Sequence, residues 1–354
     1  MTELGKVLLF EGETGRLRLV ELPKPAIGET EVLVRVEAAS ICGSDLHSIH
    51  GKRKVPIPTI LGHEIVGIVE AMGGRVNAQD ILGRKIIPGD RITWSVVANC
   101  GSCQLCLQDI PQKCLHSVKY GHEALKEGSN WNGGFAQWCV LVAGTKMVKL
   151  PQSIPLEVAC STSCATATIC ASIDAVGDVR GKNCFISGAG LLGLQAVARC
   201  LSLGAGKVYC SDRMENRLQL ARAMGAETIL TTNSGDLEKV KSVDVFVELS
   251  GATEAFDLVY PHLAIGAKVV LVGAVFPVPD NRFNMEHLIR RMITIRGVHN
   301  YAPMHLGMAV EFLEKFHEKY KLADLFGKWF KPVEHEQALQ LASSGRHHRV
   351  GFQF

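Results

Sequence analysis

The sequence predicts an α/β protein with two domains, a β-rich N-terminal domain followed by a doubly wound parallel sheet. About 150 residues at the start read mainly as strands, because Val- and Ile-rich runs such as EVLVRVEAASIC and GHEIVGIVEAMG are bounded by Gly, Pro and Asp. After Pro151, apolar strand-like runs alternate with helical runs, which is typical of a parallel sheet covered on both faces. A length of 354 residues also favours two domains over one.

The change of pattern gives the expected domain boundaries. We expect residues 1–155 to form a β-rich domain and residues 156–294 a nucleotide-binding domain of the Rossmann type. Residues 295–354 leave the strand–helix alternation, so we expect them to return to the first domain and complete it.

Composition narrows the class of protein. The net charge is only +3, and Lys and Arg are spread along the chain, which argues against a nucleic-acid or membrane partner. No apolar run reaches the ~18 residues that span a bilayer, and the first residues lack the basic segment of a secretion signal, so we expect a cytoplasmic location. With 12 cysteines and no such signal, metal binding or catalysis is favoured over a disulfide framework.

Four cysteines form a closely spaced quartet, C-x2-C-x2-C-x7-C. They are Cys100, Cys103, Cys106 and Cys114. Four thiolates can surround zinc tetrahedrally and leave no position for substrate, so we expect a structural zinc site. An iron–sulfur cluster is chemically compatible with four cysteines. A DNA-binding zinc ribbon fits less well, because it needs two separated CxxC pairs and basic surroundings.

Two motifs resemble the medium-chain zinc-dependent alcohol dehydrogenases. The stretch G62-H-E-x2-G67-x5-G73-x2-V76 matches the zinc signature of that family position for position, and the quartet is similar to its structural-zinc lobe. The resemblance covers nearly the whole chain. It implies a GroES-like fold for the first domain, a Rossmann-type second domain, one catalytic and one structural Zn2+, NAD as the cofactor, and a homodimer or homotetramer.

The resemblance also implies a catalytic zinc site. Cys42 and His63 match the first two ligands of the family. For the third ligand, Cys160 and Cys164 are both available, and Cys164 with Thr168 fits the family's C-x3-T pattern. Glu64 resembles the family's carboxylate that can approach the metal during ligand exchange. A site with few protein ligands keeps a position for the substrate oxygen, and zinc lowers the pKa of an alcohol that it polarises.

Three further residues around these ligands have expected roles. Ser44 matches the family's hydroxyl beside the zinc, and His47 matches its proton-relay residue nearer solvent. Imidazole can carry a proton near neutral pH, which suits the relay role. Asp45 is expected to hold His63 through a hydrogen bond to the ring nitrogen that does not bind the metal.

A glycine-rich loop predicts the dinucleotide site. SGAGLLG places Gly188, Gly190 and Gly193 as GxGxxG, with Leu191 and Leu192 opening the following helix. The pattern follows a strand and starts a helix, which is the context that it requires. The glycines permit a tight turn, close approach of the pyrophosphate and close packing of helix on strand, and the helix N-terminus faces negative charge.

The next strand suggests which dinucleotide binds. Asp212 ends that strand, where a carboxylate can accept a hydrogen bond from the ribose 2′-OH and repels a 2′-phosphate, so we expect NAD rather than NADP. Arg213 and Arg217 weaken this argument, because a guanidinium can receive a phosphate. By resemblance, the loops that flank the nicotinamide contain Ser250, Val272, Gly273 and Val298, and Arg349 is similar to a basic residue near the pyrophosphate.

The substrate is the least constrained part of the prediction. The context of the quartet and of VKYGHE resembles a branch of the family associated with phosphonate metabolism, which implies a small phosphonate-bearing alcohol or aldehyde. Polyols, threonine-like amino alcohols and simple alcohols are the alternatives. Cations that could meet an anionic substrate are available in loops: Lys52, Arg53, Lys54, His116 and Lys119. Trp94 and residues 299–303 are candidates for lining the pocket, and the second GHE triplet, at His122, is taken as chance.

Two other classes of protein compete with an alcohol dehydrogenase. A zinc-free, quinone-reductase-like relative would lack both the quartet and the pair Cys42 and His63, which this chain has. A non-catalytic protein retaining the fold would be expected to lose a ligand or relay residue, and none is missing.

Overall fold

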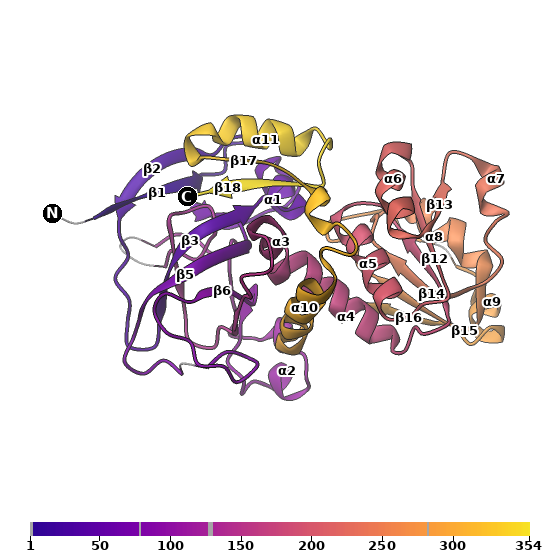
Figure 1. Ribbon diagram of the computed structural model, residues 1–354, viewed down its shortest axis with the longest axis horizontal. Coiled ribbons are helices and arrows are strands. Elements are labelled where there is room, and N and C mark those ends of the chain that lie inside the picture. Colours follow the sequence, from indigo (N-terminus) through magenta and orange to yellow (C-terminus); the bar gives the residue numbers. More distant parts are fainter. Residues whose placement is uncertain (1–2, 78, 127–129, 282) are drawn as a thin grey trace. The chain divides into compact units, whose positions relative to one another are not determined.

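The computed structural model describes residues 3–77, 79–126, 130–281 and 283–354, and the chain divides into two compact units (Figure 1). Unit 1 contains Met1–Ala167, Asn300–His317 and Leu322–Phe354. Unit 2 contains Thr168–His299 and Glu318–Lys321.

Both boundaries differ from those expected at residues 155 and 294. Helix α3 (Leu156–Cys160) belongs to unit 1 because it packs on two strands of that unit's large sheet. Strand β16 (Thr294–Gly297) belongs to unit 2 because it pairs in parallel with β15 (Leu263–Leu271) at the edge of the second sheet. Backbone pairing thus extends the nucleotide-binding unit beyond the point where the sequence pattern fades.

Unit 1 is built mainly from antiparallel strands, with one parallel pair, β17 and β18. Its strands are β1 (Leu4–Phe10), β2 (Arg18–Pro23), β3 (Val32–Ser40), β4 (Thr59–Ile60), β5 (Glu64–Met72), β6 (Arg91–Trp94), β7 (Val97–Ala98), β8 (Val118–Lys119), β9 (Trp138–Leu141), β10 (Met147–Lys149), β17 (Phe326–Phe330) and β18 (Arg349–Gln353). The large sheet has the order β10-β6-β5-β3-β18-β17, and β9 also pairs with β3. Two smaller sheets are formed by β2-β1-β4 and by β7-β8.

The helical segments of unit 1 are short, apart from two near the C-terminus. They are α1 (Gly43–Ile49), α2 (Gln104–Leu107), η1 (Pro111–Lys113), α3, the π-helical turn η2 (Thr162–Thr166), α10 (Pro303–Phe316), η4 (Leu322–Leu325), η5 (Pro332–Glu334) and α11 (His335–Ser343). Figure 1 shows α11 lying along the strands β17 and β18, against which it packs. The C-terminal segment therefore closes one side of the sheet that the N-terminal residues begin.

The core of unit 1 fixes the sheet at the point where the candidate site begins. The rings of Phe135 and Phe352 meet edge to face, with centroids 5.1 Å apart, and both are fully buried. Strand β3 pairs antiparallel with β5 so that Ser40 lies opposite Glu64, and β18 pairs with β3 so that Gly351 also lies opposite Ser40. The end of β3, the start of β5 and the C-terminal strand are thereby held side by side.

Unit 2 is the predicted doubly wound parallel sheet. Its strands are β11 (Asn183–Ser187), β12 (Lys207–Asp212), β13 (Glu227–Leu230), β14 (Val243–Glu248), β15 and β16, and its helical segments are α4 (Ala167–Val176), α5 (Leu191–Ser202), α6 (Glu215–Met224), α7 (Ser234–Leu237), α8 (Thr253–Val259), η3 (Tyr260–His262) and α9 (Met285–Arg290). All six strands are parallel, in the order β13-β12-β11-β14-β15-β16. The strand order reverses between β11 and β14, which is where such folds bind dinucleotides.

In the described parts of the chain, no helix combines the length and the apolar character needed to cross a bilayer.

Two glycines of the loop between β11 and α5 provide a matched test of packing. A Cβ on Gly193 would lie 1.7 Å from the carbonyl oxygen of Gly188, whereas a Cβ on Gly190 would meet nothing within 4 Å. We predict that Gly193→Ala lowers the free energy of unfolding by about 2 kcal/mol or more, because the helix must move off the strand. Gly190→Ala should change it by less than about 0.5 kcal/mol. Urea denaturation of both variants measures the difference, and equal losses would contradict the close packing at Gly193.

Candidate metal centres and dinucleotide site

Unit 1 brings together two cysteines and a histidine from three separate segments. The ligand atoms of Cys42, His63 and Cys164 all lie within 4.8 Å of one another. Cys42 follows the end of β3 and His63 precedes the start of β5, and these two strand ends lie side by side through the pairing of Ser40 with Glu64. The antiparallel pairing of two strands therefore places the first two members of the group.

Asp45, on the first turn of α1, connects these two members. Its side chain is fully buried, one carboxylate oxygen accepts a hydrogen bond from the main-chain N–H of Cys42 (2.9 Å), and the other accepts one from Gly62 (3.3 Å). The oxygen that accepts from Gly62, Oδ1, also lies 3.2 Å from Nδ1 of His63. Asp45 thus orients the imidazole so that Nε2 faces the group, which is the arrangement expected for a metal-binding histidine.

The third member, Cys164, lies on the π-helical turn η2. Ser163 in the same turn donates a hydrogen bond from Oγ to the carbonyl oxygen of His63 (3.1 Å) and accepts one from the N–H of Ile65 (3.4 Å). The hydroxyl of Tyr301 donates to the carbonyl oxygen of Ser163. These bonds hold the turn against the segment that contains His63. Cys160, the alternative third ligand, lies in α3 and outside the group.

The charges around the group favour a thiolate at Cys42. A hydrogen bond with Cys164 and the guanidinium of Arg349 lower the pKa of Cys42 well below its usual value, although burial opposes this. Burial also lowers the pKa of His63, but the carboxylate of Asp45 outweighs it and raises that pKa to about 10. Two cysteine sulfurs and one imidazole are the ligand chemistry of catalytic zinc sites, which keep one position open. Metal binding would displace the imidazolium proton, since a ligand must be unprotonated.

Glu64 is paired with Arg349 and lies outside this group of three. Its two carboxylate oxygens accept hydrogen bonds from Arg349 Nε (2.9 Å) and Nη2 (3.1 Å), and the hydroxyl of Ser40 donates to one of them. Burial raises the pKa of Glu64, against the effect of Arg349. An approach of Glu64 to a metal would require release from this pair. Arg349, which the resemblance assigned to the pyrophosphate, also places Nη2 3.4 Å from Cys42 Sγ.

Ser44 and His47 both lie on α1, one turn apart. The hydroxyl of Ser44 is 3.3 Å from Nε2 of His63, so it lies at the ligand group as expected. His47 is half-buried, and burial together with the charge of Lys52 lowers its pKa. A neutral imidazole at pH 7 can accept a proton, which is what a relay residue requires.

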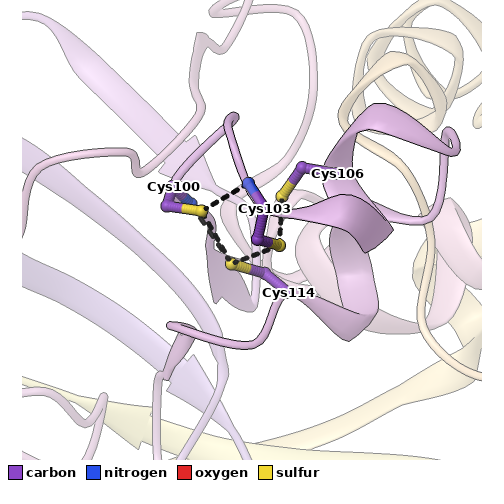
Figure 2. A group of neighbouring side chains, drawn as sticks. All are labelled: Cys100, Cys103, Cys106 and Cys114. Carbon is purple, nitrogen blue, oxygen red and sulfur yellow. Dashed lines mark hydrogen bonds between the residues drawn. The ribbon is translucent and has the colours of Figure 1, made fainter.

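The quartet forms a second, separate group in unit 1. Figure 2 shows the sulfur atoms of Cys100, Cys103, Cys106 and Cys114 directed toward one another, and all four lie within 4.8 Å. The separations are 3.5 Å between Cys103 and Cys106, 3.5 Å between Cys100 and Cys114, and 3.9 Å between Cys103 and Cys114. A tetrahedron with Zn–S bonds of ~2.3 Å has sulfurs about 3.8 Å apart, so the quartet fits zinc.

Main-chain N–H groups surround the quartet and favour thiolates. Hydrogen bonds from the N–H groups of Ser102 and Cys103 lower the pKa of Cys100 to about 5. Cys114 Sγ accepts hydrogen bonds from the N–H groups of Cys100 and His116, each at 3.3 Å. The pKa of Cys103 is lowered as well, whereas burial raises that of Cys106 to about 12. The N–H groups therefore favour the metal-binding thiolate at Cys100 and Cys103.

The glycine-rich loop of unit 2 has the conformation that the sequence predicts. Gly188 has a φ of +92°, which a residue with a side chain rarely adopts. Gly190 precedes the first residue of α5, Leu191, which Leu192 follows. The open space at Gly190 lets another group approach the backbone, and the N–H groups of the first turn of a long helix face it.

Asp212 ends β12 beside this loop. Its two carboxylate oxygens accept hydrogen bonds from the N–H groups of Ala189 and Met214, each at 2.9 Å. A carboxylate has about four acceptor positions, so capacity for a ribose hydroxyl remains. Arg213 is exposed, and within the described chain the buried Nε of Arg217 has no hydrogen-bond partner.

A buried carboxylate organises the loops at the ends of β14 and β15. Glu248 Oε1 accepts hydrogen bonds from the N–H and hydroxyl of Ser250, at 2.7 and 2.6 Å. The carbonyl oxygen of Glu248 accepts from the N–H groups of Val272 and Gly273, and Val298 donates to the carbonyl oxygen of Leu271 (3.0 Å). The loop residues named by resemblance therefore lie at the carboxyl ends of neighbouring strands.

Some residues near the group of three were missed or misjudged. The ring of His122, taken as a chance repeat, lies 5.3 Å from the ring of His63. Trp94 and Tyr301 are both buried, and Trp94 packs edge to face on Tyr120. No local spacing links His122 to His63, since they come from separate segments of unit 1.

Comparisons with known proteins agree with this geometry. The chain matches the family model of the alcohol dehydrogenase GroES-like domain over residues 28–152 and that of the zinc-binding dehydrogenases over residues 192–315. It is 31% identical to an L-threonine 3-dehydrogenase from Deinococcus deserti over 291 residues, 79% of this chain and 78% of that protein. It is 29% identical to an L-threonine 3-dehydrogenase from Photorhabdus laumondii over 336 residues, 92% of this chain and 88% of that protein. An alcohol dehydrogenase from Thermotoga maritima has a similar structure, with a TM-score of 0.92 and 26% identity over 99% of both chains.

The chain therefore belongs to the medium-chain zinc-dependent alcohol dehydrogenase family. It is an oxidoreductase of that family, whose cofactors are zinc and a nicotinamide dinucleotide. The predicted family and the predicted combination of a GroES-like and a Rossmann-type domain are confirmed. The relatives named above do not support the resemblance to the phosphonate-associated branch.

The quartet gives a prediction about metal content. We expect Cys103→Ser to lower the zinc content by about one ion per chain and to lower the thermal midpoint by several degrees, because a structural zinc stabilises its loop. Elemental analysis and differential scanning calorimetry measure both effects. Cys139→Ser is the control, because Cys139 is buried but belongs to neither of the two ligand groups. The zinc content of this variant should equal that of the parent protein. Unchanged zinc in Cys103→Ser would refute the assignment.

Proposed function

We propose that this protein is a zinc-dependent, NAD-linked alcohol dehydrogenase that catalyses reversible hydride transfer between the carbinol carbon of a small alcohol and NAD. The observation that carries the proposal is the group of Cys42, His63 and Cys164, with the Ser44 hydroxyl beside it. In this reading the three residues hold the catalytic zinc, and the quartet holds a structural one.

When bound, zinc supplies Lewis acidity that lowers the pKa of an alcohol, and NAD accepts the hydride. The residues of the chain bind, orient and move protons around this chemistry. Ser44 accepts the proton of the substrate hydroxyl and passes it toward His47, whose lowered pKa leaves it neutral and ready to receive it. Asp45 holds the imidazole of His63 in a single orientation, and Arg349 keeps Glu64 away from the ligand group until exchange.

The proposal includes the choice of NAD over NADP. The carboxylate of Asp212 accepts the 2′-OH of the adenosine ribose and repels a 2′-phosphate. Its position beside the glycine-rich loop supports this, because its Oδ2 already accepts a hydrogen bond from Ala189 between Gly188 and Gly190.

The substrate class is the finer part of the proposal. Amino alcohols of the threonine type are favoured by the names of the curated relatives, at 28–31% identity. A small phosphonate-bearing alcohol is the second candidate, supported by the cations in the loops near the ligand group. These two classes share an anionic group that simple alcohols and polyols lack.

Cys164 and Cys160 form a matched pair for testing the catalytic centre. Cys164→Ser should abolish alcohol-dependent reduction of NAD and lower the zinc content by about one ion per chain, because a weaker ligand replaces a thiolate. Cys160→Ser should keep both the zinc and the activity. Absorbance of NADH and elemental analysis give the two readouts. Full activity in Cys164→Ser would overturn the proposed centre.

Asp212 gives a separate prediction about the cofactor. We expect kcat/KM to be at least about tenfold higher with NAD than with NADP, because the carboxylate disfavours the added phosphate. Asp212→Ser should narrow this ratio by removing the charge while leaving the zinc content unchanged. Steady-state kinetics with both dinucleotides measure it, and similar values for the parent protein would refute the role of Asp212.

A further inference from the structure

Two cationic residues of unit 1, Arg53 and Lys119, lie on segments that adjoin those carrying the proposed catalytic group. Arg53 is in the loop that follows α1, and its main-chain N–H donates to the carbonyl oxygen of His47 (3.1 Å). Lys119 ends β8, where it lies opposite Val97 of β7. The loop that contains Arg53 continues from α1, the helix that carries Ser44 and His47.

The turn after β8 lies against the segment that contains His63. A Cβ on Gly121 would be only 2.7 Å from the carbonyl oxygen of Gly62, so these two stretches of backbone are in contact. His122 in the same turn places its ring 5.3 Å from the ring of His63. Lys119 is therefore held by a turn that packs directly on a ligand-bearing segment.

The charges of these groups act on one another. Burial and then the charge of Arg53 lower the pKa of Lys119 to about 8, while Cys164 and Cys42 act on it in the opposite direction. Arg53 also acts on His47 and on His122. Arg53 and Lys119 thus repel each other at the ligand group.

Among the described residues, no acidic side chain compensates this repulsion. Across the described residues, neither the ammonium of Lys119 nor the guanidinium of Arg53 has a hydrogen bond or an ion pair. Glu123 directs its carboxylate to the main-chain N–H of Lys119 (2.8 Å). Glu64 is committed to Arg349 and Asp45 to His63.

A zinc-loaded ligand group would leave the positive charges of Arg53 and Lys119 uncompensated. Zinc with two thiolates and a neutral imidazole has no net charge, so a loaded centre would not neutralise Arg53 and Lys119. Two cations that lie close together are stabilised by an anion placed between them.

We propose that Arg53 and Lys119 form an anion-binding subsite beside the catalytic centre, so that the preferred substrate carries a carboxylate or a phosphoryl-type group in addition to its hydroxyl. This inference rests on the proposed function for the reaction, but the binding of the anion does not depend on hydride transfer. The subsite selects the substrate by its charge, and it orients the hydroxyl toward Ser44.

The test measures anion binding to the zinc-loaded protein without NAD. Isothermal titration calorimetry with inorganic phosphate, methylphosphonate and acetate shows whether the subsite takes a tetrahedral anion, a carboxylate or both. We expect Lys119→Gln and Arg53→Gln each to weaken binding by about tenfold or more, as for the loss of a charge-assisted hydrogen bond. Lys119→Arg should keep most of the affinity. Lys54→Gln is the matched control, because Lys54 is an exposed cation next to Arg53, and it should bind like the parent protein.

The outcomes separate the subsite from the reaction. Absence of binding of all three anions, or equal binding by the parent protein and both Gln variants, would overturn the subsite, even if neutral alcohols are oxidised. Anion binding that is lost in both Gln variants and kept in Lys54→Gln would support the subsite. If no alcohol then reduces NAD, the proposed function fails while the subsite stands. With activity present, kcat/KM for an alcohol bearing a carboxylate or phosphonate should exceed that for 1,2-propanediol, and this ratio should fall in Lys119→Gln. Zinc content and thermal midpoint confirm that each variant is folded and loaded.

Discussion

The pairing of β3 with β5 is the constraint on which the rest of the candidate centre depends. Cys42 follows one strand and His63 precedes the other, so their approach is set by the register that places Ser40 opposite Glu64. A slip of one residue would turn each side chain to the opposite face of the sheet. The buried carboxylate of Asp45 then fixes the same arrangement from the helix side, since it accepts hydrogen bonds from both ligand-bearing segments.

Charge balance decides how the buried groups of this centre coexist. A thiolate at Cys42 is tolerated because the guanidinium of Arg349 lies 3.4 Å away, and that guanidinium is itself balanced by Glu64. Removing one partner of such a pair leaves an uncompensated buried charge, which is strongly destabilising. Arg53 and Lys119 have no acidic partner among the described residues, unlike Arg349, which is paired with Glu64. A paired cation of this kind is structural, whereas an unpaired one is available to an external anion.

Features set by short spacing could be predicted from the sequence, and those set by long-range contacts could not. The quartet and the glycine-rich loop each lie within one short segment, so their spacing alone indicates the geometry. Arg349 and Glu64 are 285 residues apart, and only the pairing of β18 with β3 brings them together. The sequence favours Cys164 over Cys160 only through the C-x3-T pattern with Thr168, whereas in the structure the hydrogen bond of Ser163 places Cys164 beside His63. Unit 2 extends beyond residue 294 because β16 pairs with β15, and such backbone pairing leaves no trace in the hydropathy pattern.

The central claim is that this chain holds two zinc ions, one at each of its two ligand groups. Anomalous diffraction from crystals of the protein, measured on both sides of the zinc absorption edge, tests it most directly. We predict two peaks, one at about 2.3 Å from the sulfurs of Cys42 and Cys164 and at about 2.1 Å from Nε2 of His63, and the other at the centre of the quartet. A single peak at the quartet, with none between Cys42, His63 and Cys164 in a fully loaded and active enzyme, would contradict the account.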